Sequence, residues 1–153
     1  MKDEKFMKIA IEEAKKGDYP FGAVIVKNNK IISKIHNTAG KLDPTAHAEI
    51  NAIRKTCKKI KSIDLSGCIL YTTCEPCPMC FTAAWWAHIS RIVYGMEAED
   101  VTEEDWKIDI KCKELNNRSG NKIQIKGSVL REECKKLLKL IKYIPKQKAY
   151  RCL

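Results

Sequence analysis

The chain of 153 residues has the length of one domain, and its 44% hydrophobic and 31% charged residues are typical of a globular protein. No apolar run is long enough to cross a membrane, and the charged start over residues 1–5 is unlike a secretory signal. We therefore expect a cytoplasmic protein whose cysteines stay reduced. The net charge of +10 fits a nucleic-acid partner, although a basic tail is more often a solvated helix face.

The first part of the chain predicts a helix followed by a hairpin. Apolar residues recur with a helical period from about Asp3 to Lys16, where Gly17 ends the helix. The apolar run over 21–26 predicts a buried strand, and a turn at 28–29 leads into a second strand over 30–35. The small residues Gly22 and Ala23 have two interpretations: a strand end that a flat ligand can approach, or simple close packing.

A polar loop over 36–43 leads to a second helix, which we expect to begin at Asp43 and continue to Ile60. An aspartate cap followed by Pro44 is a well-formed helix start. This start places His47 and Glu49 in the opening turn. Because residues two apart do not share a helix face, both can serve one site only if the end of the helix points into it.

A strand over 68–72 delivers the motif that carries most chemistry, in which Cys77 and Cys80 are separated by two residues. Pro78 suits a first helical position, so we expect Cys77 at the N-terminus of a helix that runs through Trp86. Two thiolates at this spacing can bind one tetrahedral zinc ion, and the helix dipole favours the thiolate form. A pair of reduced cysteines or half of a four-ligand structural site are the alternatives.

With His47 as a third ligand, the zinc ion would keep its fourth position for water, which marks a catalytic site. Glu49 would then carry the proton. The rest of the chain predicts a strand over 91–95, a short helix over about 106–115, a strand over 123–125 and a basic helix over 131–144. Because no repeat or low-complexity linker interrupts it, we expect a single domain over 1–153.

With these motifs in place, the chain resembles the cytidine deaminase-like superfamily, and within it most closely the bacterial guanine deaminases. The resemblance runs from about residue 6 to residue 94 and is strongest in three segments: 20–26, 43–49 and 71–80. Its His-x-Glu and Pro-Cys-x-x-Cys pattern is the signature of zinc-dependent nucleobase deaminases. The resemblance implies an α/β fold, a three-layer α/β/α sandwich around a mixed five-stranded sheet.

The resemblance also implies roles for individual residues in the hydrolysis of guanine to xanthine and ammonia. Zn²⁺ would be bound by His47, Cys77 and Cys80, while Glu49 would move the proton from water to the substrate ring and the departing amine. The expected substrate contacts are the side chain of Asn37, the backbone of Ala48 and Glu75, and the rings of Phe21 and Trp86.

The chain departs from the guanine deaminase pattern in two places. The Gly-Phe-Asp-Asp segment with an aspartate near the substrate amine is missing, and Asp109 or Asp105 would have to supply that carboxylate unless each is only a surface residue. The family's tail often closes the pocket of a neighbouring subunit. By that resemblance we expect a homodimer in which the tail over 145–153 is exchanged and Tyr150 takes the closing position.

Three alternatives to guanine deamination remain open. A tRNA-specific adenosine deaminase shares the zinc signature and suits the positive charge, but the Trp85-Trp86-Ala87-His88 run departs from the His-Ser-Arg typical of that group. Deamination of another amino-heterocycle such as cytosine is the second. A catalytically inactive nucleic-acid-binding relative is the third, and the intact Glu49 argues against it because binding alone needs no general base.

Overall fold

The computed structural model describes residues 2–17, 19–41, 43–102 and 108–140. Its helices and strands are α1 (Lys2–Ala14), β1 (Gly22–Lys27), β2 (Lys30–His36), α2 (Ala48–Ile60), β3 (Cys68–Cys74), α3 (Pro78–Trp86), β4 (Arg91–Met96), α4 (Cys112–Arg118), β5 (Gln124–Lys126) and α5 (Arg131–Lys136), with 3-10 helices η1 (Ala98–Asp100) and η3 (Leu137–Leu140). None of these described helices is both long and apolar enough to cross a membrane.

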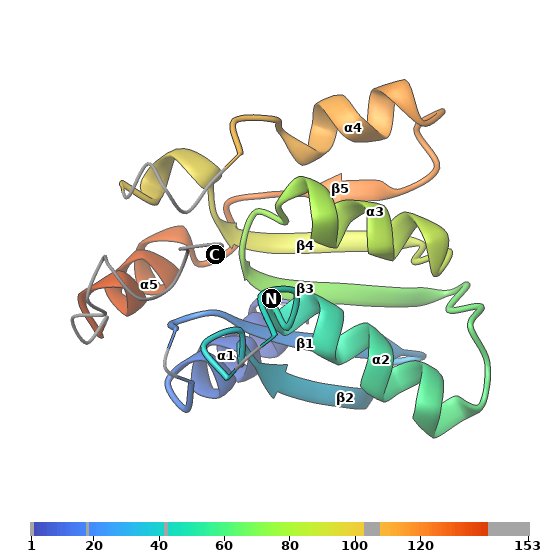
Figure 1. Cartoon of the computed structure of the whole chain (residues 1–153), viewed down its shortest axis with the longest axis horizontal. Coiled ribbons are helices and arrows are strands. Elements are labelled where there is room, and N and C mark those ends of the chain that lie inside the picture. The colour runs from blue at the N-terminus through green and yellow to red at the C-terminus, as the bar shows by residue number, and fades with distance from the viewer. Residues whose placement is uncertain (1, 18, 42, 103–107, 141–153) are drawn as a thin grey trace, which may run out of the picture.

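The strands form one mixed sheet in the order β2-β1-β3-β4-β5 (Figure 1). Strand β1 runs antiparallel to both of its neighbours, whereas β3, β4 and β5 run parallel to one another. The parallel arrangement places the end of β3 beside the end of β4. The expectation of a mixed five-stranded sheet is therefore confirmed.

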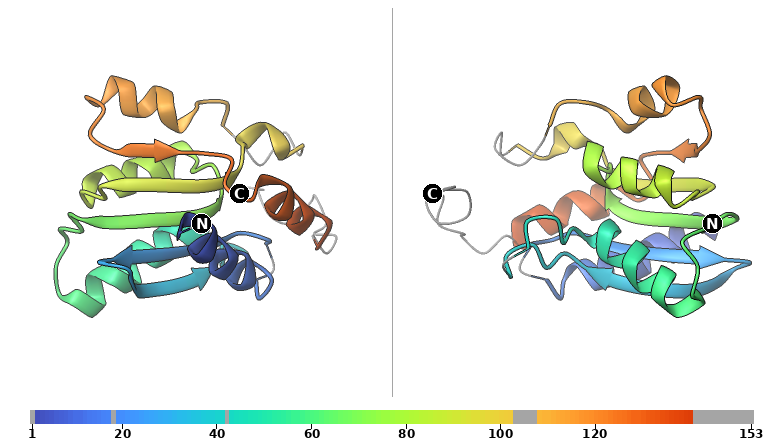
Figure 2. Two further views of the ribbon diagram at one scale, coloured as in Figure 1. Left: turned by 180° about the vertical axis from the view of Figure 1, so that it is seen from behind. Right: turned by 45° about the vertical axis from the view of Figure 1, so that its right-hand side comes forward.

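Helices cover both faces of this sheet. Helices α2, α3 and α4 lie on the face toward the viewer in Figure 1, and α1 and α5 lie on the opposite face, which Figure 2 shows from behind. Each face has its own apolar core, one centred on Ile25, Leu70 and Ile92 and the other on Val24, Tyr71 and Val93. Because successive strand residues point to opposite faces, these neighbouring residues serve different cores, and the α/β/α sandwich is confirmed.

Helix α1 lies directly against β1 at Gly22. A Cβ atom at this position would collide with the carbonyl oxygen of Ala10 and would lie 2.6 Å from the amide nitrogen of Ala14. Of the two interpretations of Gly22, close packing is therefore the one that the structure supports.

Helix α2 begins later than the sequence predicts, at Ala48 rather than near Asp43. The carboxylate of Asp43 accepts hydrogen bonds from the backbone N–H and the hydroxyl of Thr45, at 2.9 and 2.6 Å, and so forms a local turn instead of a helix cap. The backbone of His47 is extended, with φ −62° and ψ 157°, and His47 is the N-cap. It therefore stands just outside the helix, one position before the first turn.

The two last predicted helices also have different bounds. Helix α4 begins at Cys112, where the backbone N–H donates to the carboxylate of Glu75, which caps the helix from another element. Residues 108–111 of the predicted helix are not helical, and its first residues, 106–107, lie outside the described residues. The basic helix changes from α5 into the tighter η3 at Leu137. The rest of its predicted length, residues 141–144, lies outside the described residues.

Candidate active site

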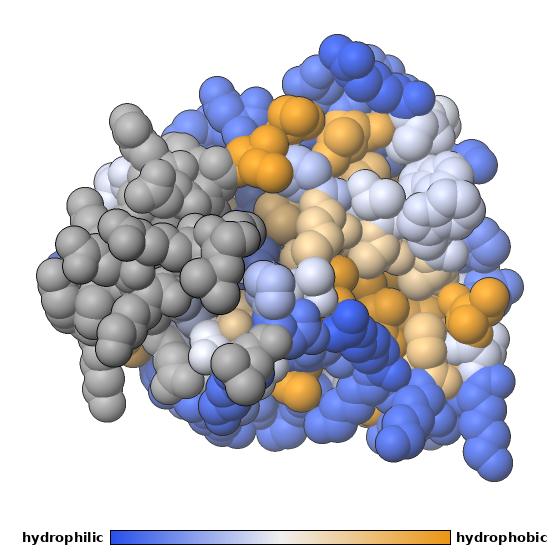
Figure 3. Space-filling model, in the orientation of Figure 1, coloured by the Kyte–Doolittle hydropathy of each residue, from blue (hydrophilic) through white to orange (hydrophobic). Residues whose placement is uncertain are grey.

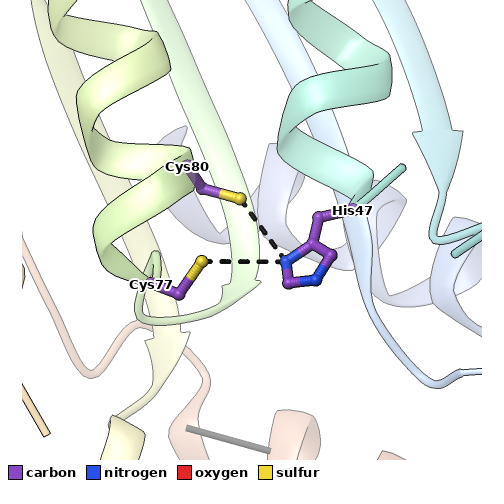
Figure 4. Close-up of side chains that lie close together, drawn as sticks. All are labelled: His47, Cys77 and Cys80. Atoms are coloured by element: carbon purple, nitrogen blue, oxygen red, sulfur yellow. Dashed lines mark hydrogen bonds between the residues drawn. The ribbon is translucent and has the colours of Figure 1, made fainter. Parts of the chain in front are cut away.

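Three side chains meet where two helices begin. His47 is the N-cap of α2, Cys77 is the N-cap of α3, and Cys80 lies in the first turn of α3, behind Pro78 at the first helical position. Figure 4 shows the three side chains pointing toward one another from these two helix starts. The residues that the sequence proposes as metal ligands are therefore neighbours in the fold, although 30 positions separate His47 from Cys77.

The spacing of the three ligand atoms fits a zinc ion. The Nδ1 atom of His47 lies 3.7 Å from the Sγ atom of Cys77 and 3.6 Å from that of Cys80. Tetrahedral zinc with Zn–N and Zn–S bonds of about 2.0–2.3 Å holds its ligand atoms about 3.5–3.8 Å apart. One imidazole and two sulfurs also suit zinc chemically, and three protein ligands leave one coordination position for another molecule.

The cluster already favours one thiolate. Hydrogen bonds from Cys80 and from His47, acting against burial, lower the pKa of Cys77 to about 4. The hydrogen bond to Cys77 and burial raise the pKa of Cys80 well above its ordinary value. The hydrogen bond with Cys77 raises the pKa of His47. The pair thus presents an anionic sulfur next to a thiol that can lose its proton when a cation binds.

Glu49 lies beside this cluster, in the first turn of α2, and is only 6% exposed. The hydroxyl of Thr72 donates a hydrogen bond of 3.0 Å to Oε1 of Glu49, and the thiol of Cys80 approaches Oε2 to 3.5 Å. Burial raises the pKa of this carboxyl group. A buried carboxylate that is fixed in orientation and held at a raised pKa is suited to accepting and returning a proton.

A pocket opens in front of these residues, and most of its wall is apolar. It is lined by Tyr19, Phe21, Asn37, Ala39, His47, Glu49, Cys74, Glu75, Pro76, Cys77, Ala98, Val101, Ile108 and Ile110. Asn37 is almost fully buried, and its Oδ1 atom accepts the backbone N–H of Ala39 at 2.8 Å. Of the proposed substrate contacts, Phe21, Asn37 and Glu75 therefore lie at the pocket together with Glu49.

Two of the other proposed contacts, Trp86 and Asp109, are not at the pocket. Trp86 is 69% exposed at the far end of α3, about 13 Å along the helix from Cys77, and lines a separate surface hollow. Asp109 is exposed and is not among the residues lining the pocket. Ala48 is fully buried beneath the helix start, where its backbone N–H has no partner within the helix. Asp105 and Tyr150 lie outside the described residues.

The sequence interpretation missed most of the apolar wall. Ile108 and Ile110, on either side of Asp109, line the pocket, as do Val101 and Tyr19. The sequence favoured Asp109 between them because a carboxylate could lie near the substrate amine. The signal that was available is the pair of isoleucines itself, which is unusual in a segment otherwise rich in charge.

Residues 1–96 match the family model described as the cytidine and deoxycytidylate deaminase zinc-binding region. The chain is 43% identical over 122 residues to guanine deaminase from Bacillus subtilis (strain 168). This alignment covers 76% of this chain and 78% of that protein. It is 46% identical over 100 residues to the tRNA-specific adenosine deaminase from Aquifex aeolicus (strain VF5), which covers 62% of this chain and 66% of that protein.

The fold is similar to that of a solved structure from a study of A-to-I editing by tRNA:A34 deaminases. The TM-score is 0.75 with 29% sequence identity, over 87% of this chain and 98% of the other. The sequence match includes His47, Glu49, Cys77 and Cys80 within its residue range. The chain therefore belongs to the cytidine and deoxycytidylate deaminase family and is a hydrolytic, zinc-dependent aminohydrolase.

Proposed function

We propose that the protein deaminates a free nucleobase, and that the base is guanine. The composition of the pocket carries this proposal: among the described residues that line it there is no lysine or arginine. Recognition of nucleic acid depends on basic side chains that contact phosphate, whereas a mostly apolar pocket with a few polar groups suits a small, flat, neutral molecule. The similarity to the Bacillus guanine deaminase over most of both chains also supports guanine.

In the proposed reaction, guanine and water give xanthine and ammonia. His47, Cys77 and Cys80 would hold a zinc ion, which would supply the Lewis acid that lets water act as a nucleophile near neutral pH. The carboxylate of Glu49 would take one proton from the attacking water and deliver it to the ring nitrogen as the water oxygen bonds to the carbon. It would then carry the second proton, from the hydroxyl now on that carbon, to the amine, which leaves as ammonia when the carbon–nitrogen bond breaks. Thr72 keeps Oε1 of Glu49 in place during both transfers.

We assign substrate binding to residues at the pocket and its edge. The bond from the Ala39 N–H fixes Oδ1 of Asn37, so its amide nitrogen is left to donate to an acceptor on the base. Phe21 offers an aromatic surface for the ring. The backbone N–H of Ala48 at the start of α2 and the backbone carbonyl of Glu75, whose N–H is bonded to the carbonyl of Met96, offer hydrogen-bonding groups for its edge. The exposed positions of Trp86 and Asp109 do not support such a role for either residue.

A tRNA-specific adenosine deaminase is the second candidate. The net charge of +10 and the similarity to the Aquifex enzyme favour it. Ammonia release by the zinc-loaded protein should be compared for guanine, adenine, cytosine and an adenosine-containing anticodon stem-loop. We expect turnover of guanine. Turnover of the stem-loop alone would show that the substrate is RNA rather than guanine. Turnover of cytosine alone would show that the substrate is a pyrimidine.

We further propose that two copies of the chain associate through the outer face of α3. Apart from the exposed Thr82, every residue of this helix is apolar, a pattern typical of helices that are covered all round, yet Trp86 is exposed. Figure 3 shows hydrophobic atoms gathered across the middle of this face, over α3, with hydrophilic atoms above and below. The proposed exchange of the tail over 145–153 concerns residues outside those described.

Sedimentation velocity tests this association. We expect a species of twice 17.5 kDa for the unmodified protein and a shift toward one copy for Trp86→Lys. Ile63→Lys is the matched control, because Ile63 is also a highly exposed apolar side chain but follows α2 rather than lying on α3. A single-copy species for the unmodified protein would contradict the proposal.

We also propose that the enzyme works in the cytoplasm. The free cysteines of the described residues support this location, because thiols stay reduced there.

A further inference from the structure

The side chain of Glu75 is buried at the end of β3, two residues before the zinc-binding Cys77. It is 5% exposed, although it carries a carboxylate. Its Oε2 atom accepts the backbone N–H of Ala98 at 3.2 Å, and its Oε1 atom accepts the backbone N–H of Cys112 at 2.9 Å. Each carboxylate oxygen therefore holds a different part of the chain.

These two parts are the ends of the segment that forms the apolar wall of the pocket. Ala98 begins η1 and Cys112 begins α4. Between them, Val101, Ile108 and Ile110 line the pocket opposite the zinc ligands. One carboxylate thus fixes both ends of this wall to the loop that carries Cys77.

Of the other contacts in the neighbourhood, the ion pair between Lys111 and Glu99 also joins the two ends of the wall, but it lies between partly or fully exposed side chains. The remaining contacts hold one end only. Glu97 accepts hydrogen bonds from the hydroxyls of Tyr94, at 2.8 Å, and Ser128, at 2.6 Å, next to η1. The guanidinium of Arg131 on α5 makes two hydrogen bonds to Asp100 of η1, at 2.8 and 2.9 Å. Among the described residues, Glu75 is the side chain that accepts hydrogen bonds from the backbone of both Ala98 and Cys112.

The charge of Glu75 is balanced locally. The ammonium group of Lys111 lies 3.7 Å from Oε2 of Glu75 and also pairs with Glu99. A carboxylate that accepts backbone N–H groups makes stronger hydrogen bonds than a neutral side chain does. An amide at this position could accept one N–H through its oxygen, but its NH₂ group would face the second N–H as a donor.

We propose that Glu75 is a positioning residue for the deamination reaction. Its carboxylate sets the separation between the described wall residues, over 98–102 and 108–112, and the zinc ligands, and so determines how tightly a base is held in the pocket. It does this through the backbone of Ala98 and Cys112 and without donating or accepting a proton. The inference rests on the deaminase activity, and it holds whichever base the enzyme uses.

Hydrogen exchange followed by mass spectrometry tests the structural step without substrate. In zinc-loaded Glu75→Gln we expect backbone amides over 98–112 to exchange about tenfold faster than in the unmodified protein, because one charge-assisted bond is lost. Amides of β1 and β3 should exchange as before, and zinc content should be unchanged. Glu114→Gln is the matched control, since it makes the same chemical change in an exposed glutamate of α4 that pairs with Arg118 and lies outside the wall.

Steady-state kinetics tests the functional step on whichever base of the panel the unmodified enzyme turns over. For Glu75→Gln we expect KM to rise about tenfold while kcat changes less than about threefold, because the wall moves but Glu49 does not. Glu114→Gln should match the unmodified enzyme in both constants. Unchanged exchange over 98–112, faster exchange spread equally over the sheet, or an unchanged KM would each overturn the proposal. If the enzyme does not turn over guanine, the hydrogen-exchange measurement still tests the proposal, because it uses no substrate.

Discussion

His47 and Cys77 face each other from the N-caps of two different helices, with Nδ1 3.7 Å from Sγ. Neither side chain lies inside a helical turn, so the directions of both depend on how α2 and α3 pack against the same sheet. Helices α2 and α3 contact each other, and both N-termini point toward the anionic sulfur. The metal centre is therefore a product of tertiary packing as much as of the cysteine motif.

Replacing a ligand should remove the metal. We expect the unmodified protein to bind about one equivalent of zinc and His47→Ala or Cys80→Ser to lose most of it, because two protein ligands hold zinc poorly. Elemental analysis after dialysis measures this. Cys57→Ser is the control, since Cys57 is a thiol of α2 outside the cluster. Retention of zinc by both ligand variants would show that other side chains bind it.

Glu49→Gln should keep its zinc and lose turnover by about 10²–10⁴-fold, since the amide cannot take the proton from water. Ammonia release and zinc content should be measured on the same preparation. Glu13→Gln is a matched control, because Glu13 is equally buried at 6% exposure but lies on α1 and pairs with Lys16 and Lys34. Substantial turnover by Glu49→Gln would remove Glu49 from the mechanism.

Thr72→Val tests whether the orientation of Glu49 matters. Valine fills the same volume but cannot donate the 3.0 Å hydrogen bond to Oε1 of Glu49. We expect kcat to fall about tenfold because the carboxylate of Glu49 is no longer held in one orientation. Zinc content should be unchanged, because the zinc ligands are not altered. Thr56→Val serves as the control: this threonine is also fully buried, but its hydroxyl bonds to Ser33. Equal loss of kcat in both variants would point to a general packing effect.

The sequence predicts the local parts of the site well. Pro78 and the cysteine spacing are enough to place Cys77 at the start of a helix, as the structure has it. The start of α2 was predicted four to five residues too early, because Asp43 and Pro44 form a turn that resembles a helix cap. Contacts distant in sequence determine the true start: the amide of Asn51 bonds to the carbonyls of His36 and Ala46 and so holds the loop beside the helix.

The wall of the pocket could not be predicted from local sequence for the same reason: contacts between residues distant in sequence determine it. Its ends depend on the bonds from Ala98 and Cys112 to Glu75, which join residues 23 and 37 positions apart. Nothing in the periodicity of the segment reports those bonds. Trp86 is the opposite case, because local sequence was sufficient there. The length of α3 is predictable from the sequence, and it places Trp86 away from the metal site.

The stability of the fold at acid pH should depend on Asp3. Asp3 joins α1 to the sheet through hydrogen bonds from Arg91, at 3.1 and 2.9 Å, from Lys126 at 2.7 Å and from the Tyr71 hydroxyl at 3.0 Å. Burial opposes ionisation, but these bonds outweigh it and lower the pKa of Asp3 to about 2. In the unfolded chain an aspartate has a pKa of about 3.9.

A group whose pKa is lower in the folded state stabilises the protein above its unfolded pKa, and this contribution disappears as the pH falls through the folded pKa. We therefore expect Asp3→Asn to lower the free energy of unfolding by about 1–2 kcal/mol at pH 6, a difference that shrinks between pH 4 and pH 2. Urea denaturation at several pH values measures it. Glu12→Gln is the control on the same helix, because Glu12 is exposed and pairs with the exposed Lys15 rather than with the sheet. A difference for Asp3→Asn that stays constant down to pH 2 would show that the charge of Asp3 does not hold α1 against β4.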